Sequence, residues 1–540
     1  MSRGQSFIKG AAILGAAGAL VKILGAIYRI PLSNIIMDEG IGYYQTAYPF
    51  YILLLTLSTA GIPVAIAKLV SEKRALGDYR NAHKVFQVAL VGLFFGGIIT
   101  SLVVALGARN IVGYLGNPNA YYALIALVPA LFFVPIMGAF RGFFQGRQSM
   151  VPTALSQVIE QLFRVITGLG LTYLLLGYGI PIAAGGASFG GSTGAIAGTA
   201  VIVFIYFKYR KTMKAEIELS KIKSEYPVKQ IVRDLLLIAV PITMGSAISP
   251  TMDTIDAAIV LRRLQYIGYS VEMSNSLYGH LKGMAQTLIN LPQVFSMAIA
   301  MSLVPAISDA KTRKAKGEVE DLITSGIRIT LLIGLPAAFG LFVLSKPIIA
   351  LLYYKNTPEA ISSVGTLLSY LAFGVIFLTL VQTLTAMIQG LGKPFVPVKN
   401  LFIGAVAKII LTFVLTGIPS INVKGAAIST VTAYAVAASL DLRYIVKVEK
   451  IKLNVKKIMT KPLLSAIGMG VVARVSYELF QGFIGSSKAT IVGVGVGAIV
   501  YFALLIITGA LTREDLELMP KGKKIGRLID KYKPSKKGSK

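Results

Sequence analysis

Apolar runs of about 20 residues recur from one end of this chain to the other, and they constrain the fold more than any other feature. Each run is long enough to cross a hydrocarbon core of ~30 Å, because an α-helix rises ~1.5 Å per residue. Only 14% of the residues are charged, against roughly 25% in soluble domains. No alternating pattern supports a sheet. The sequence therefore predicts an all-α polytopic membrane protein.

We predict about 14 membrane-spanning helices. They cover residues 8–32, 42–67, 85–107, 120–144, 153–177, 186–207, 235–260, 280–307, 323–344, 362–389, 397–417, 424–445, 461–482 and 488–510.

Basic residues are concentrated in alternate loops between these helices. Residues 208–233 hold eight Lys and Arg against three Glu, whereas residues 177–194 carry no charge. This is the positive-inside pattern of membrane proteins, and it predicts an even number of spans with both termini in the cytoplasm. The net charge of +30 is thereby explained, with anionic lipids rather than nucleic acid as partners.

The chain also contains two copies of one unit. Gln145-Gly146, Pro152 and Arg164 recur as Gln389-Gly390, Pro397 and Lys408. The copies are about 240 residues apart in the same orientation, so the repeats are parallel. They predict two six-helix lobes, related by a pseudo-two-fold axis along the membrane normal, with a cleft between them. The predicted domains are an N-terminal lobe (1–207), a cytoplasmic basic linker (208–233), a C-terminal lobe (234–445), two additional helices (446–510) and a basic cytoplasmic tail (511–540).

Four stretches resemble the SpoVB and MurJ-like branch of the multidrug/oligosaccharidyl-lipid/polysaccharide exporter superfamily. They are Leu24–Pro31, Gly61–Arg80, Arg141–Arg164 and Leu303–Ser308. The resemblance covers essentially the whole chain. It implies a flippase of the bacterial plasma membrane that carries an undecaprenyl-pyrophosphate-linked saccharide, with lipid II as first candidate, to the outer leaflet. We expect a monomer without a cofactor.

A diphosphate favours arginine and lysine as ligands. Arg29 lies in the first predicted span, where MurJ-like proteins have a functionally important arginine. It either contacts phosphate or snorkels outward and pairs with Asp38 or Glu39, which we assign to an outer gate. Arg141 and Arg147 are further basic candidates, in a predicted cytoplasmic turn, where they either collect the head group or only set the topology. Arg262 and Lys282 lie at the outer ends of predicted spans, where they either form a release site or are solvated.

MurJ-like proteins also carry an acidic residue early in the second span. Here Tyr43, Tyr44 and Gln45 stand in that region, so the identity of the saccharide stays open.

Five acidic and basic residues inside the spans, Lys408 among them, are candidates for charge pairs or coupling. Glu160 and Arg164 are spaced i, i+4, so they share a helix face. Asp253 and Asp256 lie on the seventh span, and Asp253 resembles an aspartate that helps bind a coupling sodium ion in MurJ-like proteins.

An asparagine that partners this aspartate in MurJ-like proteins aligns with Lys408. We therefore expect the ammonium of Lys408 to replace the metal and to pair with Asp253, so that sodium is not used; the alternative is that Lys408 faces the cleft. Cysteine is absent, and two scattered histidines make no metal site.

Three other classes of function compete with the flippase. A cation-coupled exporter of small drugs would need acidic residues in the cleft, where this chain offers Arg29 and Lys408. An integral-membrane enzyme would need a catalytic cluster or a large soluble loop. A non-transporting factor for envelope or spore assembly would bind without flipping. Within the flippase class, a sporulation-specific polysaccharide exporter stays open, as does the energy source.

Overall fold

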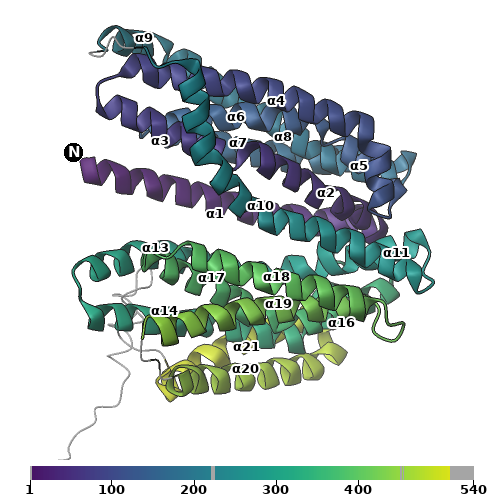
Figure 1. Ribbon diagram of the computed structural model, residues 1–540. Helices are drawn as coiled ribbons and strands as arrows, with labels where there is room; N and C mark the ends of the chain where they lie inside the picture. Colours follow the sequence, from purple (N-terminus) through teal and green to yellow (C-terminus); the bar gives the residue numbers. More distant parts are fainter. Residues whose placement is uncertain (1–2, 221–224, 451–452, 454, 511–540) are drawn as a thin grey trace, which may run out of the picture. The chain divides into compact units, whose positions relative to one another are not determined.

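The computed structural model describes residues 3–220, 225–450, 453 and 455–510, and Figure 1 shows their helices in chain order. Every regular element in these ranges is a helix. Thirteen of the described segments are apolar and long enough to cross a membrane, and α16 with α17, bent by 44°, would form a fourteenth. The predicted all-α fold with about 14 spans is confirmed. The predicted basic tail, 511–540, lies outside the described residues.

Contacts divide the chain into two compact units, each described here by itself. The first comprises Met1–Met284 with Thr416–Val423. Its helices are α1 (Arg3–Ile35), α2 (Met37–Thr59), α3 (Ile62–Ala75), α4 (Tyr79–Tyr114), α5 (Tyr121–Ile125), α6 (Val128–Gly146), α7 (Val151–Leu175), α8 (Ile180–Lys208), α9 (Arg210–Glu218), α10 (Val228–Tyr266) and α11 (Val271–Tyr278), followed by a π-helix (Gly279–Ala285).

The second unit begins at Ala285 and contains the remaining helices. They are α12 (Gln286–Ile289), α13 (Gln293–Thr312), α14 (Lys316–Val343), α15 (Ser345–Leu352), α16 (Pro358–Ala372), α17 (Gly374–Gly390), α18 (Phe395–Thr416), α19 (Lys424–Arg443), a short π-helix (Tyr444–Val448), α20 (Val455–Ile484) and α21 (Ser486–Thr508).

The long helix α10 packs against α2, α3 and α4 of the first unit. The sequence places most of this helix in the second repeat, which begins at residue 234. Because α10 packs on the first unit, the boundary between the compact units falls after Met284, 50 residues later than the predicted start of the second lobe. The predicted lobes rest on the repeat and not on contacts, so their boundaries stay a prediction.

Two predicted spans are interrupted helices. The second, expected over 42–67, stops at Thr59 and restarts at Ile62. The break packs on α10: a Cβ at Gly61 would overlap the carbonyl group of Ala239, and the Gly61 amide donates to Thr243 Oγ1 at 3.1 Å. Glycine is therefore required where the broken helix touches α10.

The eighth span, expected as one helix over 280–307, is wrong in that form. The chain there passes through the π-helix and α12, breaks after Ile289, and resumes as α13 at Gln293. Pro292 stands in the break, and proline lacks an amide donor and disfavours helical geometry in the residue before it. A π-helical turn commonly marks a functional position in a longer helix.

The small residues of Ala183–Gly198 provide the close helix packing that the sequence suggests. They lie in α8, which packs along α7. A Cβ at Gly190 would come within 2.6 Å of the carbonyl oxygen of Arg164, and one at Gly194 would overlap that of Glu160. The backbones touch closely because no side chain separates them. This contact fixes the position of the part of α7 that carries Glu160 and Arg164.

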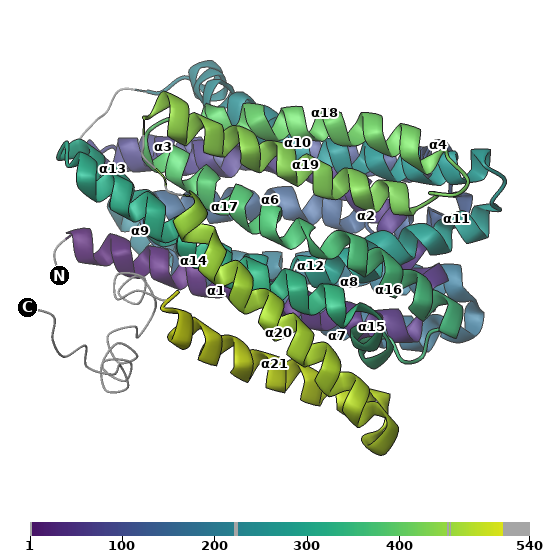
Figure 2. The same cartoon turned by 90° about the horizontal axis from the view of Figure 1, so that it is seen from below.

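The additional helices α20 and α21 lie side by side, as Figure 2 shows, and belong to the second unit. α20 packs on α14, and α21 contacts α15. Tyr501 of α21 donates a buried hydrogen bond of 2.8 Å to the carbonyl of Leu332 in α14. A carbonyl in the interior of a helix accepts this bond in addition to its own, so α21 is attached to α14 by a polar contact inside an apolar core.

Candidate functional site

Three charged side chains meet within the first unit, on the antiparallel helices α6 and α7. Glu160 accepts from Arg164 Nη2 at 3.1 Å through Oε1 and from Arg141 Nη2 at 2.9 Å through Oε2. Each side chain is about 16% exposed. The formal charges of the three groups sum to one positive charge. We call Arg141, Glu160 and Arg164 the arginine–glutamate cluster.

Polar and aromatic neighbours hold this cluster. Arg141 Nε donates to Ser156 Oγ at 2.8 Å, and Arg164 donates to the hydroxyl of Tyr48 at 3.4 Å. The ring of Tyr48 stacks on Tyr44, with centroids 5.3 Å apart, and lies 5.9 Å from that of Tyr51. The guanidinium groups are thus held by residues of α2 and α7 rather than left to rotate in lipid.

The i, i+4 pair of Glu160 and Arg164 is present as the spacing predicts. Arg141, expected in the turn after α6, instead lies inside this helix, which continues to Gly146. It therefore faces α7 and joins the pair. Arg29 lies in α1, which packs along α7, and is partly buried. Its role as a phosphate ligand stays a prediction.

A second charged group surrounds Lys282, in the π-helix. Its Nζ atom lies 2.9 Å from Asp256 Oδ2 and 3.3 Å from Asp253 Oδ1. The lysine side chain is 9% exposed and that of Asp256 2%, whereas Asp253 is 47% exposed. The alternative that Lys282 is solvated is wrong, because its side chain is buried, and its role in a release site stays a prediction. The backbone is held too, because Gln45 donates to the Lys282 carbonyl at 3.0 Å.

The predicted pair of Asp253 with Lys408 has a competitor in this arrangement. Asp253 has Lys282 as an ion-pair partner. Lys408 is buried in α18 of the second unit, so its pairing stays a prediction. Spacing along the chain does not reveal Lys282 as the partner, because Asp253 lies in α10 and Lys282 in the π-helix.

The two acidic residues assigned to an outer gate have specific partners. Asp38 lies 3.0 Å from His280 Nε2, and Glu39 accepts from the Tyr43 hydroxyl at 2.8 Å. The Glu39 carbonyl also accepts from Asn275 at 2.7 Å. These contacts join the start of α2 to α11 and the π-helix. The gating role stays a prediction.

Arg262 and Arg147 lie apart from both clusters. Arg262 is exposed and donates to the carbonyls of Tyr114, at 2.9 Å, and Gly113, at 3.3 Å, which end α4. It caps that helix. Arg147 follows the end of α6 and pairs with Glu216 of α9, at 2.8 Å. Glu216 was missed from the sequence, although its negative charge inside the basic linker was a usable signal.

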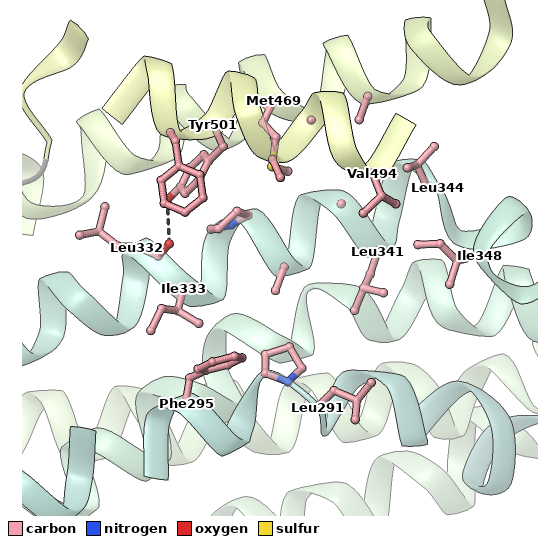
Figure 3. Close-up of a pocket in the computed structure, with 18 of the residues that line it drawn as sticks. Leu291, Phe295, Leu332, Ile333, Leu341, Leu344, Ile348, Met469, Val494 and Tyr501 are labelled. Carbon is pink, nitrogen blue, oxygen red and sulfur yellow. Dashed lines mark hydrogen bonds between the residues drawn. The ribbon is translucent and has the colours of Figure 1, made fainter. Parts of the chain in front are cut away.

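The second unit contains an apolar cavity of about 1150 Å³. Figure 3 shows the cavity between α14 and the pair α20 and α21, with the segment around Leu291 and Phe295 on the other side. Its lining is almost entirely hydrocarbon, from residues such as Leu332, Leu341, Met469 and Tyr501. Phe295 and Phe502 are 62% and 66% exposed, so the cavity opens at the surface. Sequence patterns gave no sign of it.

Two family models match the chain. The polysaccharide biosynthesis protein family matches residues 7–311, and the MatE family matches residues 282–414. Stage V sporulation protein B of Bacillus subtilis (strain 168) is 30% identical, over 97% of this chain and 99% of its own. The lipid II flippase MurJ of the same organism is 29% identical, over 92% of this chain and 94% of its own.

Solved structures share the fold. A lipid II flippase MurJ in an inward closed conformation superimposes with a TM-score of 0.68 at 16% identity, covering 92% of this chain and 98% of its own. An inward-facing multidrug resistance MATE family transporter gives a TM-score of 0.65 at 15% identity, over 78% of this chain and 93% of its own. Both have a two-lobe all-α fold.

Proposed function

The chain belongs to the polysaccharide biosynthesis protein family of the multidrug/oligosaccharidyl-lipid/polysaccharide exporter superfamily, and from this premise we propose that it is a flippase for a lipid-linked saccharide. It is a multi-pass membrane protein related to the lipid II flippase MurJ and to stage V sporulation protein B. Its substrate is an undecaprenyl-pyrophosphate-linked saccharide, lipid II in the first place, which moves from the inner to the outer leaflet by alternating access.

The observation that carries this proposal is the arginine–glutamate cluster. Two guanidinium groups share a single carboxylate inside helices that cross the membrane. A positive charge at that depth is costly unless an anion compensates it. A diphosphate supplies both the charge and the oxygens for bidentate hydrogen bonds from arginine. A cationic drug would be repelled.

The apolar cavity of the second unit supports the same substrate class. A polyprenyl tail is a long hydrocarbon chain, and its transfer from water to an apolar surface is favourable by roughly 25 cal/mol per Å². A cavity lined by Leu, Ile, Phe and Met offers that surface without any polar group that the tail would leave unpaired. We assign the tail, or part of it, to this cavity.

We further propose that transport does not require sodium and that the protein acts as a monomer, with both termini in the cytoplasm. The ammonium of Lys282 supports the first point, because it lies where a bound cation would neutralise Asp253 and Asp256. The sequence alone predicts Lys408 in this role. Substitution of Lys282 and substitution of Lys408 can be tested separately for their effect on sodium dependence.

The test is binding of lipid II to the purified protein by native mass spectrometry. We expect a one-to-one complex that is lost in Arg29→Ala and in Arg164→Ala and retained in Arg313→Ala, an exposed arginine of the α13–α14 turn. Flipping of a fluorescent lipid II in proteoliposomes then separates a transporter from a factor that only binds. A folded protein that binds no lipid II contradicts the assignment and favours another lipid-linked glycan or a small-molecule exporter.

A further inference from the structure

Arg74 at the end of α3 and Arg147 after α6 converge on one carboxylate. Glu216 Oε2 accepts from Arg74 Nη1 at 2.7 Å and from Arg147 Nη1 at 2.8 Å. Its Oε1 atom accepts from Arg147 Nη2 at 3.1 Å and, more weakly, from Arg74 Nη2 at 3.5 Å. Four N–H groups therefore share two oxygens. We call Arg74, Arg147 and Glu216 the linker clasp, because α9 lies in the linker between the repeats.

The two guanidinium groups also lie over aromatic rings that belong to elements other than α9. The plane of Arg74 lies over the ring of Tyr79, 5.0 Å from its centroid, and Arg147 lies over Phe143 at 5.5 Å. The two arginine side chains are only 23% and 15% exposed. Together with Tyr79, His83 and Phe143 they line a small hollow. The arginines thus form a preorganised fork for an anion.

Glu216 lies on a short helix that buries little of its own surface. Helix α9 is nine residues long, and Met213 is its one buried residue. Isolated helices of this length are marginal in water. Helix α9 also carries Arg210, Lys211 and Lys214 against Glu216 and Glu218, so with Arg74 and Arg147 the basic residues outnumber the acidic ones. The hollow has a volume of only about 10 Å³ and is walled by Met213, Glu216 and Ile217 of α9, so a larger anion reaches the arginines only if α9 moves away.

We propose that Arg74 and Arg147 form a binding site for the phosphate group of an inner-leaflet lipid, that Glu216 occupies this site in the present structure, and that phosphate binding releases α9. Compared with a carboxylate or a lipid phosphodiester, each of which has two unesterified oxygens and one charge, a terminal phosphate such as that of a lipid diphosphate offers three terminal oxygens and up to two negative charges. It matches two guanidinium forks better. The side on which the site lies follows from the predicted topology.

Release of α9 has a consequence for the rest of the linker. α9 continues directly from α8 and is followed, after a short connection, by α10. While the clasp is closed, the linker is fixed to α3 and α6. When phosphate binds the two arginines, Glu216 is displaced and the linker is no longer fixed. Because the two anions compete for the same arginines, the contact with Glu216 also weakens phosphate binding. The site therefore couples lipid occupancy to linker freedom, whatever substrate the protein transports.

Binding is measured with the full chain in phosphatidylcholine nanodiscs, with undecaprenyl diphosphate and phosphatidylglycerol as lipid probes and inorganic pyrophosphate as the soluble probe. In Glu216→Gln the arginines lose their internal anion, and we expect lipid affinity to rise at least about fivefold. Arg74→Gln with Arg147→Gln should abolish this gain. Glu218→Gln makes the same charge change at an exposed position of α9 and should bind like the wild type.

The linker is followed by spin-label distances between Leu76→Cys and Thr212→Cys, which are both exposed and are unique labelling sites because the chain has no cysteine. We expect one short distance in the unliganded protein and in Glu218→Gln, and a broad, longer distribution on lipid addition or in Glu216→Gln. This readout needs no transport, so it stands or falls separately from the flippase assignment.

Two outcomes would overturn the proposal. If Glu216→Gln changes neither affinity nor distance, the clasp is a static ion pair. If pyrophosphate opens the clasp but both lipids leave it closed, the site serves a soluble anion and not a lipid. Opening by either lipid supports it, and the more effective of the two identifies the head group.

Discussion

At the scale of single residues, Glu160 is the position where a small change has the largest expected effect. Glu160→Gln leaves two partly buried guanidinium groups facing one another without their carboxylate. Removing one partner of a buried ion pair costs on the order of 3 kcal/mol. We expect the melting temperature in detergent to fall clearly below that of the wild type, and Arg313→Ala to melt like the wild type. Equal melting of Glu160→Gln and the wild type would contradict the cluster.

Lys282 gives the second prediction at this scale. Lys282→Gln removes the ammonium that lies between Asp253 and Asp256. Two carboxylates without a shared cation attract a metal ion or repel one another. We expect sodium to raise the thermal stability of the variant and to leave the wild type unchanged, with choline chloride as the ionic-strength control. A sodium-dependent wild type would refute the proposal that an internal ammonium replaces the ion.

Sequence reasoning predicts pairs within one helix and misses pairs between helices. The i, i+4 spacing of Glu160 and Arg164 is enough to place them together. Arg141 and Lys282 join their clusters because of helix rotation and a π-helical turn, and neither can be read from spacing along the chain. A single sequence gives the charge of each residue but not the neighbour that compensates it.

At the scale of elements, the linker clasp predicts a pH effect. Burial alone would raise the pKa of Glu216, but the hydrogen bonds and positive charges of Arg74 and Arg147 outweigh it and hold that pKa below its ordinary value. The clasp is therefore fully formed at neutral pH and weakens only as pH falls through this lowered pKa. We expect the distance between the labels at 76 and 212 to stay short from pH 7 down to the ordinary carboxyl range and to lengthen below it. Glu216→Gln should show no pH dependence.

The break between α2 and α3 gives a second prediction for elements. Gly61→Ala places a Cβ against the carbonyl group of Ala239 in α10. Overpacking of this kind lowers the free energy of unfolding by about 1–3 kcal/mol. Here the added methyl group pushes α10 away from the broken helix. Gly92→Ala is the matched control, because a Cβ at that position meets nothing within 4 Å. Thermal unfolding should show a loss for Gly61→Ala alone.

Apolar length predicts where helices lie but not where they break. Residues 42–67 and 280–307 read as continuous spans because hydropathy averages over the breaks at Gly61 and Pro292. Both breaks are set by neighbours in three dimensions. Glycine and proline occur elsewhere in these helices without interrupting them, as Pro305 does inside α13, so composition alone does not locate an interruption.

At the scale of the whole molecule, the cavity of the second unit predicts selectivity for tail length. Ala337 lines the cavity from α14, and Ala337→Phe fills part of its volume. We expect weaker binding of a lipid with a long polyprenyl tail and unchanged binding of a short-tailed analogue in native mass spectrometry. Leu106→Phe adds bulk on an exposed face of α4 and serves as the control. Equal loss of both lipids in Ala337→Phe would show that the cavity does not hold the tail.

The fold class and the number of spans were within reach of the sequence, because a bilayer demands apolar helices of a fixed length. The cavity could not be predicted from the sequence, because it depends on how α20 and α21 pack beside α14. Such packing leaves no periodic signal in the sequence. The two additional helices looked like an appendage outside the repeat. Their place beside α14 makes them a wall of the apolar cavity of about 1150 Å³.

The open, hydrocarbon-lined wall of that cavity has a consequence for any measurement made in a bilayer. Phe295 and Phe502 at its opening face outward, so the acyl chains of ordinary phospholipids compete for the same surface. The apparent affinity of a long-tailed ligand then depends on the length and unsaturation of the surrounding lipids. Nanodiscs with short saturated chains and nanodiscs with long unsaturated chains should therefore give different dissociation constants for one protein and one ligand.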